Sequence, residues 1–491
     1  MSDGSPVDFP KVVSFKTVGA FNAHLRTLGL TVSADAELLS GPDAPLAQPI
    51  RIGPLTVGNR WAIQPMEGWD GTEDGRPTDW TRRRWRHFGQ SGAKLIWGGE
   101  AVAVRHDGRA NPNQLMISEQ NVPAFRQLRE LLVDEHNKAC GRPDDLVVGL
   151  QLTHAGRFSR PNAKDRLEPR ILYRHPILDV RCGITTDDAI VSDDWIDELI
   201  DDFVRAADWA AQAGFQFVDI KHCHGYLGHE FLSAHTRDGP YGGSFENRTR
   251  FLARVVEGIR RYVPRMVVCV RVSAFDTPPF EGGPERVGSP ADWRAVVPYR
   301  YGFGLRPDDP LQIDLAEPKR FVKLCQALGV AAVNVSAASP YYNPHLQRPA
   351  AFSPSDGYRP PEDPLIGVAR QIAAAAQLKA ACPGIVLVGS GYSYLQDFLP
   401  NVAQSVVRCG QVDIVGVGRM ALSYWQMPGD ALAGRPLQRK RICRTFSDCT
   451  SGPRQGFISG CFPLDELYAL SEPGRKLRAI KRQAKPSHPS E

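Results

Sequence analysis

Short apolar runs recur along most of the chain and alternate with stretches of helical periodicity. The runs are rich in β-branched residues and are bounded by Gly, Pro and polar residues, which is the pattern of buried strands. They lie at 61–66, 94–99, 146–152, 215–220, 266–272, 330–335, 385–389 and 412–418. Helical periodicity covers 80–91, 121–138, 193–213, 245–262, 316–328, 365–381 and 393–408. Eight strands alternating with helices predict an α/β fold, a (β/α)8 TIM barrel whose active site lies on the loops after the strands.

The segments outside this alternation predict extensions at both ends of the barrel. Residues 1–48 contain one short helical stretch, 18–28, followed by a Pro- and Ala-rich connector. We therefore predict an N-terminal extension at 1–48, a barrel at 49–430 and a C-terminal extension at 431–491. Three long loops, at 157–192, 274–315 and 338–364, follow strands and are expected to shape a substrate pocket.

Composition narrows the class of protein. A chain of 491 residues with 42% apolar content can bury one large barrel with its extensions. The formal net charge is +5, and residues 471–491 alone hold six basic against two acidic side chains. Because the excess charge sits in this tail, no broad basic face indicates a nucleic-acid partner. The Arg-rich helix at 80–91 is interpreted as an outer barrel helix with snorkelling arginines.

The start of the chain and its cysteines indicate a reducing compartment. MSDGSPVDFPK lacks the basic segment and apolar run of a secretory signal, and no later stretch approaches membrane-spanning length. The ten cysteines lie mostly in apolar runs, such as those at Cys269, Cys325 and Cys382, where reduced core thiols are expected. We predict a cytoplasmic protein without a membrane partner that acts on a small molecule.

The strand at 215–220 is followed by the densest group of chemically active residues. The sequence reads HGYLGHEFLS at 224–233, Arg-Asp at 237–238 and YGGSFENRTRF at 241–251. This long, ordered match resembles the old yellow enzyme family of FMN-dependent oxidoreductases. The resemblance implies a TIM barrel that binds FMN and takes electrons from NAD(P)H.

The same resemblance assigns flavin contacts to the ends of other strands. Pro65 and Met66 correspond to the backbone that borders the isoalloxazine ring. Ala101 corresponds to a backbone amide near a flavin carbonyl, and Gln151 to a side chain at the pyrimidine edge. Arg271 corresponds to the cation aimed at N1 and O2, where it stabilises the anionic reduced flavin.

Two Gly-rich corners predict a phosphate site at the ends of the last two strands. Ser390 and Gly391 follow the seventh strand, and Gly418 and Arg419 follow the eighth. Barrels often bind phosphate there through backbone amides, a helix N-terminus and, here, an Arg side chain. Either glycine alone is also explained by turn conformation. Together they favour FMN.

The family resemblance also indicates the catalytic groups. His224 matches the second residue of the pair that holds the electron-withdrawing oxygen of an activated alkene, and Tyr226 matches the proton donor. The first His of the pair is replaced by Lys221. His222 is one position off and is expected to point to the other side of the strand.

Lys221 and Glu67 differ from the residues that the family usually has at these two positions, and each difference leaves alternatives open. The Lys221 ammonium would stabilise an enolate oxyanion, bind a substrate carboxylate, or form a structural ion pair with Glu67 or another carboxylate at the barrel mouth. Glu67 stands where the family commonly places a small Thr or Cys beside the flavin. If ionised it would lower the flavin potential, and if protonated it would donate a hydrogen bond.

A cysteine loop near the C-terminus resembles that of the dienoyl-CoA reductase and trimethylamine dehydrogenase branch. Cys443, Cys449 and Cys461 lie in it, while the counterparts of that branch's upstream pair fall near Ile442 and Thr445. Three candidate ligands where four are needed argue against an intact [4Fe–4S] cluster. No GxGxxG follows a strand after this loop, so we expect no nucleotide-binding domain there.

The leading functional prediction is NAD(P)H-dependent reduction of an activated C=C bond. The alternative within flavin chemistry is dehydrogenation or demethylation of a substrate, with electrons passing to an external acceptor. A remote alternative is a barrel enzyme in which Lys221 forms a Schiff base, or a flavin-binding protein without turnover. His229 and His235 match no ligand spacing, so no metal site is predicted. The resemblance implies that a homo-oligomer is possible.

Overall fold

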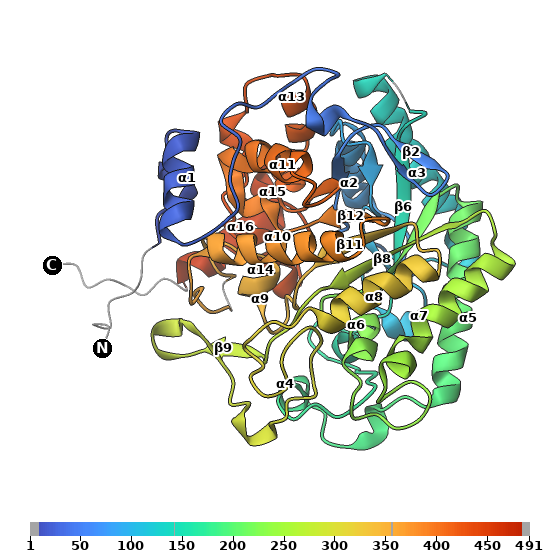
Figure 1. Cartoon of the computed structure of the whole chain (residues 1–491). Coiled ribbons are helices and arrows are strands. Elements are labelled where there is room, and N and C mark those ends of the chain that lie inside the picture. The colour runs from blue at the N-terminus through green and yellow to red at the C-terminus, as the bar shows by residue number, and fades with distance from the viewer. Residues whose placement is uncertain (1–8, 142, 355–356, 484–491) are drawn as a thin grey trace.

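The computed structural model describes residues 9–141, 143–354 and 357–483. Its central sheet is closed, because strand order β4-β3-β13-β12-β11-β8-β7-β6-β5 is joined by a further β4–β6 pairing, and all its pairings are parallel. These strands are β3 (Trp61–Ile63), β4 (Leu95–Ile96), β5 (Ala101–Ala103), β6 (Val147–Thr153), β7 (Phe217–His222), β8 (Val267–Ser273), β11 (Ala332–Ser336), β12 (Val386–Gly389) and β13 (Ile414–Val417). The predicted (β/α)8 barrel is confirmed (Figure 1).

The second barrel strand is interrupted. Its two halves, β4 and β5, pair with successive parts of β6. Gly98 and Gly99 lie between the halves with φ of 151° and 57°. A Cβ at Gly98 would come within 2.8 Å of the Gln151 nitrogen, and one at Gly99 within 2.6 Å of the Trp85 ring. The break therefore requires glycine, and it brings Glu100 to the mouth of the barrel.

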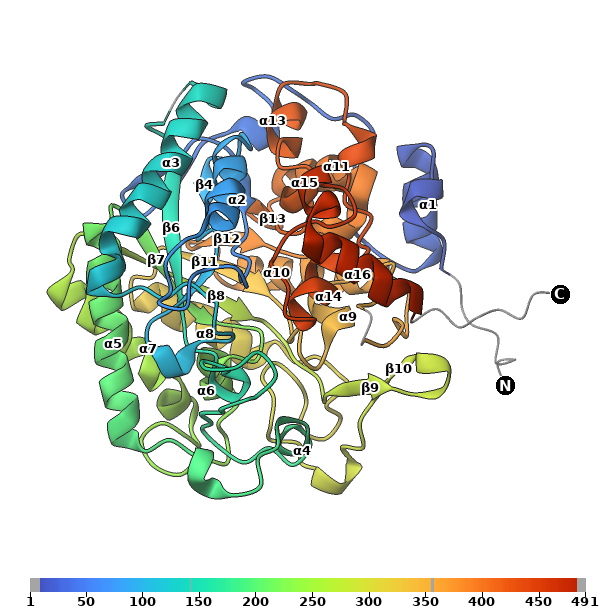
Figure 2. The ribbon, with the colours of Figure 1, turned by 180° about the vertical axis from the view of Figure 1, so that it is seen from behind.

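Helices cover the outside of the barrel, and two small hairpins add to it (Figures 1 and 2). The helices are α1 (Val18–Thr27), α2 (Asp79–Gly89), α3 (Val122–Cys140), α4 (Leu178–Cys182), α5 (Asp193–Gln212), α6 (Leu227–Leu232), α7 (Phe245–Tyr262), α8 (Ala316–Ala327), α9 (Pro344–Gln347), α10 (Pro364–Ala381), α11 (Leu399–Arg408), α12 (Met420–Ser423), α13 (Met427–Leu432), α14 (Asp448–Arg454), α15 (Glu466–Leu470) and α16 (Glu472–Gln483). The hairpins are β1 (Ile50–Ile52) with β2 (Leu55–Val57), and β9 (Phe280–Gly282) with β10 (Gly288–Pro290). All seven predicted barrel helices are present, although the last begins as a 3-10 turn at Tyr392–Phe398 before α11.

The barrel interior is closed at the end where the strands begin. Ile52 and Val57 of the β1–β2 hairpin, which the sequence pattern did not predict, pack against inward-facing residues of the strands. Those residues include Leu95, Val147 and Phe217, all fully buried. With that end sealed by apolar packing, the opposite end is left for polar groups.

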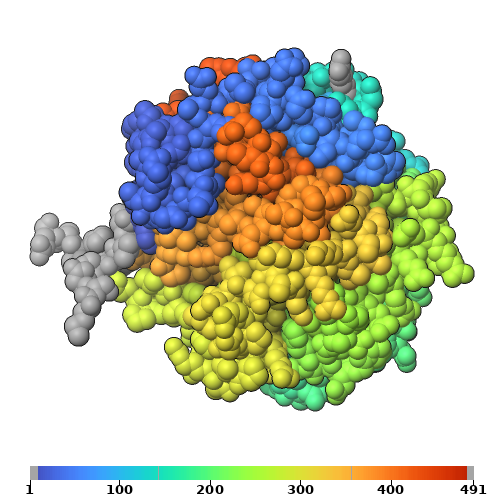
Figure 3. All heavy atoms as spheres, in the orientation of Figure 1, coloured from blue at the N-terminus to red at the C-terminus, as the bar shows by residue number. Residues whose placement is uncertain are grey.

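The two extensions pack on the barrel. In the N-terminal segment, Phe21 of α1 stacks on Phe398 with ring centroids 4.3 Å apart, and Figure 3 shows this segment lying against the orange C-terminal part of the barrel. In the C-terminal segment, Arg83 of α2 forms an ion pair of 2.6 Å with Asp465. The boundaries at 48 and 430 stay predictions. Within the described residues, no helix combines the length and apolar character needed to cross a bilayer.

Candidate active site

A cavity of about 270 Å³ opens at the carboxyl ends of the barrel strands. The sequence-predicted site residues all line it, namely Pro65, Met66, Glu67, Ala101, Gln151, Lys221, His224, Tyr226, Arg271, Ser390, Gly391, Gly418 and Arg419. Part of the wall comes from the C-terminal extension, through α14 and the segment up to Gly460. The structure therefore brings residues from β3 to β13 and from the extension to one place.

Tyr226 lies at the centre of a hydrogen-bonded group in this cavity. Its phenol is 1% exposed, donates a hydrogen bond to Glu67 and lies 2.7 Å from the hydroxyl of Tyr341. Burial, and then the Glu67 carboxylate, hold the pKa of Tyr226 well above 10. Glu67 also accepts from Trp69 at 3.1 Å and from Asn111 at 3.4 Å. Tyr226 thus keeps its proton, and Glu67 accepts from three donors as a carboxylate would.

His224 is held as a neutral imidazole beside Tyr226. Its backbone is in the left-handed region with φ of 68°, and its amide donates to the Ser273 hydroxyl at 3.1 Å. Burial lowers the pKa of His224 well below 6.5, with Arg271 and Lys221 adding to the effect. The Nε2 atom lies 2.8 Å from the hydroxyl of Ser336. A neutral ring in this position can donate a hydrogen bond to an oxygen atom.

Lys221 points into the cavity and His222 points away from it, as predicted from strand alternation. The Lys221 Nζ lies 3.7 Å from the centroid of the Tyr226 ring, and its side chain is 6% exposed. Among the described residues Lys221 has no ion pair, so the alternative of a structural pair with Glu67 is wrong. His222 instead lies between Phe251 and Phe321, with ring centroids 6.0 and 5.9 Å away.

Arg271 stands beside Lys221 in the register of β7 and β8. Its Nη2 donates weakly to Ser390 at 3.4 Å, and its Nε has no partner among the described residues. Gln151 lines the cavity, but its amide nitrogen donates to Asp219 at 2.6 Å. The amide oxygen and the second N–H of Gln151 therefore remain for a ligand. Burial raises the pKa of Asp219 to about 6.

The predicted phosphate site at Ser390, Gly391, Gly418 and Arg419 has, in the described part of the chain, an unpaired donor, and Gly391 lets other groups come close to the backbone. Gly391 adopts φ of 93°, and a Cβ there would lie 2.8 Å from the Gln371 amide. Arg419 donates to the Pro349 carbonyl at 2.7 Å through Nη2, while its Nη1 has no partner among the described residues. Gln64, which was not predicted, donates to Ser390 at 3.0 Å and so fixes this corner.

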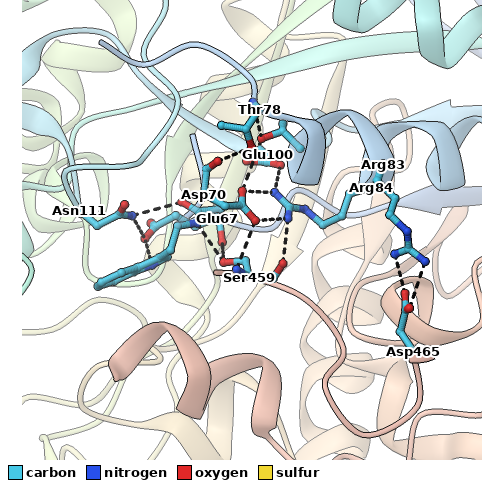
Figure 4. Close-up of polar contacts among 12 residues, drawn as sticks. Glu67, Asp70, Thr78, Arg83, Arg84, Glu100, Asn111, Ser459 and Asp465 are labelled. Atoms are coloured by element: carbon cyan, nitrogen blue, oxygen red, sulfur yellow. Dashed lines mark hydrogen bonds and ion pairs between the residues drawn. The ribbon is translucent and has the colours of Figure 1, made fainter. Parts of the chain in front are cut away.

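A buried ion network supports the wall that carries Glu67 (Figure 4). Arg84 of α2 is 5% exposed and pairs with Asp70 and with Glu100, in each case at 2.5 Å. It also donates to the Ser459 carbonyl of the C-terminal extension at 2.9 Å. Burial raises the pKa of Glu100 to about 7. The prediction that the arginines of this helix snorkel to solvent is therefore wrong for Arg84.

The cysteine loop lies next to the cavity. Cys449 lines it, and Cys443 and Cys461 are buried nearby. Burial raises the pKa of Cys443 and of Cys461, and the Cys449 thiol raises both further. All ten cysteines are free thiols. Within the described part of the chain, no three His, Cys, Asp or Glu side chains are arranged as a metal site.

The fold and the site define a closed parallel barrel with a cavity suited to an anionic ligand. Residues 45–281 match the model of the NADH:flavin oxidoreductase / NADH oxidase family, which confirms the predicted resemblance to old yellow enzymes. The NADPH dehydrogenase of Geobacillus sp. (strain WCH70) is 34% identical over 240 residues. That match covers 48% of this chain and 64% of the relative, so it spans less than two thirds of the relative's length.

Solved structures share the fold over most of the chain. A 2-naphthoyl-CoA reductase in complex with 2-naphthoyl-CoA superposes with a TM-score of 0.62 and 19% identity, covering 88% of this chain and 58% of that one. An old yellow enzyme homologue from Zymomonas mobilis has a TM-score of 0.53 and 22% identity, covering 82% and 96%. At such identities these likenesses describe the barrel and not its chemistry.

The residues of the cavity fit FMN. The unpartnered Arg271 Nε and Arg419 Nη1 are cationic donors buried without an anion among the described residues, which suits a ligand with a phosphate and a ring that gains negative charge. Gly391 and Gly418 leave room for close approach to the backbone at the corner that Arg419 shares.

Proposed function

We propose that the protein is an FMN-dependent oxidoreductase that uses NAD(P)H to reduce an activated C=C bond. The observation that carries the proposal is a single cavity in which Tyr226, His224 and Lys221 adjoin Arg271 and the Gly391 corner. The family match and the NADPH dehydrogenase relative support the class of reaction.

The cofactor would be held from several strands. Pro65, Met66 and Ala101 would border the ring system, and Gln151 and Arg271 would meet its pyrimidine edge. Ser390, Gly391, Gly418 and Arg419 would hold the phosphate. FMN, when bound, accepts a hydride from the nicotinamide and delivers it to the substrate.

The chain's own residues would bind and protonate the substrate. The neutral imidazole of His224 would donate a hydrogen bond to the electron-withdrawing oxygen, with the ammonium of Lys221 beside it. Tyr226 would hold the proton on its phenolic oxygen, which the raised pKa of Tyr226 keeps in place at neutral pH. Tyr341 and Trp69 would help exclude water from the cavity.

An anaerobic titration of the purified protein with NADH and then NADPH tests this proposal. We expect bleaching of the visible flavin bands without a broad iron–sulfur absorption, and the faster nucleotide identifies the donor. A bound flavin that neither nucleotide reduces would favour the substrate-oxidising alternative. Absence of flavin after reconstitution with FMN would overturn the proposal.

We also propose a cellular location from the cysteines and an oligomeric state from the family resemblance. Ten free cysteines, most of them buried, suit the reducing cytoplasm, where we place the protein. A homo-oligomer is proposed from the family resemblance alone, and light scattering of the purified protein would test it.

A further inference from the structure

Two neighbouring buried cations of the cavity, Lys221 and Arg271, have two carboxylates near them, Asp219 and Glu67, and neither carboxylate forms an ion pair with Lys221. Lys221 and Arg271 are 6% and 5% exposed, stand opposite each other on β7 and β8 and line the same cavity. Asp219, two positions before Lys221, already accepts from Gln151 and from Trp97 at 2.6 and 2.7 Å. Both hydrogen bonds end on Oδ2, and Oδ1 of Asp219 forms neither a hydrogen bond nor an ion pair with Lys221 among the described residues.

Glu67 forms no ion pair with Lys221, and its charge only partly offsets the lowering of the pKa of Lys221 by burial. Its carboxylate accepts hydrogen bonds from Tyr226, Trp69 and Asn111. Among the described residues the Lys221 ammonium lies over the ring face of Tyr226, 3.7 Å from its centroid, and has no hydrogen bond or ion pair. The ring face attracts the buried cation but offers no acceptor in the usual hydrogen-bonding geometry for its three N–H groups. A buried ammonium without a hydrogen-bond acceptor is costly, so this position is built for an anionic ligand.

The neighbours of each cation indicate which ligand it serves. Arg271 reaches toward Ser390, at the corner assigned to the cofactor. Lys221 lies against Tyr226, whose hydroxyl meets that of Tyr341 at 2.7 Å. Tyr341 in turn stacks on Phe158 with ring centroids 4.2 Å apart. The Lys221 ammonium is therefore bordered by aromatic surface on the side proposed for the substrate.

We propose that the substrate is an unsaturated carboxylic acid whose carboxylate is bound by Lys221. This inference rests on the proposed function and specifies its substrate class. One carboxylate oxygen would accept from the ammonium of Lys221 and the other from the neutral imidazole of His224, while the apolar body lies along Tyr226 and Tyr341. Lys suits a carboxylate as a compact, strongly charged donor, where a neutral carbonyl would need only imidazole or amide donors.

Calorimetric titration of the flavin-containing protein with benzoate and with benzamide at pH 7 tests this inference. The two probes have similar shapes and differ in charge. We expect benzoate to bind about tenfold more tightly, because a hydrogen bond to a charged group is worth about 1.4 kcal/mol or more. Lys221→Met should remove the difference, and Lys221→Arg should retain most of it. Lys138→Met, at an exposed helix position 70% accessible to solvent, makes the same charge change away from the cavity and should keep the full preference.

Equal affinity of the wild-type protein for the two probes would overturn the inference without any variant. A preference for benzoate that survives Lys221→Met would also overturn it. The visible flavin spectrum of each sample separates the two proposals. Loss of flavin from Lys221→Met but not from Lys138→Met would assign Lys221 to the cofactor and overturn the inference. A protein that prefers benzoate but never binds FMN would retain the carboxylate site and lose the proposed function.

Discussion

The phenol of Tyr226 donates a hydrogen bond to the carboxylate of Glu67, a residue 159 positions away in the chain. Glu67 follows β3 and Tyr226 follows β7, so the barrel brings together two strand ends from different parts of the sequence. The proposed proton donor is thereby coupled to the residue proposed to lie beside the flavin. A change at Glu67 should affect both electron and proton transfer.

Replacing Glu67 by Gln should raise the midpoint potential of the bound flavin. A carboxylate beside the ring opposes the negative charge that reduction adds, and an amide of similar shape does not. We expect a rise of about 30 mV, the two-electron equivalent of about 1.4 kcal/mol. Spectroelectrochemical titration measures it. Glu67→Asp is the control that keeps the charge, and a potential for Glu67→Gln at or below that of the wild type would contradict the prediction.

Replacing Tyr226 by Phe should slow substrate reduction and leave flavin reduction intact. The variant removes a positioned proton donor, which typically contributes about 10²- to 10⁴-fold. Stopped-flow kinetics separate reduction of the flavin by NAD(P)H from its reoxidation by an unsaturated substrate, and only the second rate should fall. Because the pKa of Tyr226 lies well above 10, the wild-type reoxidation rate should show no loss from Tyr226 ionisation between about pH 6 and 9. Equal slowing of both half-reactions would indicate damage to the flavin site instead.

Asp276 should make the protein less stable as the pH rises toward neutrality. Its carboxyl is 3% exposed, accepts from Tyr342 at 2.8 Å and lies 3.9 Å from His229. Burial raises the pKa of Asp276 to about 7, compared with about 3.9 in the unfolded chain. Between these values the folded state holds a proton that the unfolded state releases, so the stabilisation present at low pH is lost as the pH passes through 7.

The variant Asp276→Asn cannot titrate and isolates this effect. Relative to it, the unfolding free energy of the wild type should fall by up to about 1.4 kcal/mol per pH unit between about pH 5 and 7. Urea unfolding of both proteins across that range measures the difference, in which other titrating groups cancel. A difference that is independent of pH would show that Asp276 does not titrate there.

The barrel could be predicted because its strands are buried on both faces. A strand such as β7 is then a largely apolar run, and the alternation of its side chains is enough to place Lys221 inside the barrel and His222 outside it. The position of each strand end follows from the same runs. For this reason the residues predicted at the strand ends all line one cavity.

The contacts between strand ends could not be predicted, because sequence spacing carries no information on them. Tyr341 comes from a long loop without periodicity, yet its hydroxyl meets Tyr226. Arg84 lies in a helix whose other arginines are more exposed, and its burial depends on Asp70 and Glu100 arriving from two separate loops. The Gly98-Gly99 pair was the one available signal that the second strand breaks and turns Glu100 toward Arg84.

Removal of the Arg84 charge should destabilise the protein strongly. Arg84→Met keeps much of the side-chain volume but leaves Asp70 and Glu100 buried at 5% and 1% exposure without their cation. Breaking a buried ion pair from one side typically costs about 3–5 kcal/mol. We expect a loss of that size in urea unfolding. The hydrogen bond from Arg84 to the Ser459 carbonyl is lost as well, so the cavity wall formed by the C-terminal extension should loosen.

Arg82→Met is the matched control on the same helix. Arg82 is 39% exposed and pairs at 3.4 Å with Asp79, whose side chain is fully accessible, so its loss should change stability by less than about 1 kcal/mol. Limited proteolysis distinguishes a loosened extension from global unfolding, because cleavage near Ser459 should appear in Arg84→Met before the barrel is cut. Equal stability of the two variants would mean that the desolvation cost of the Arg84 network already offsets its attraction, as it does in some buried ion triads.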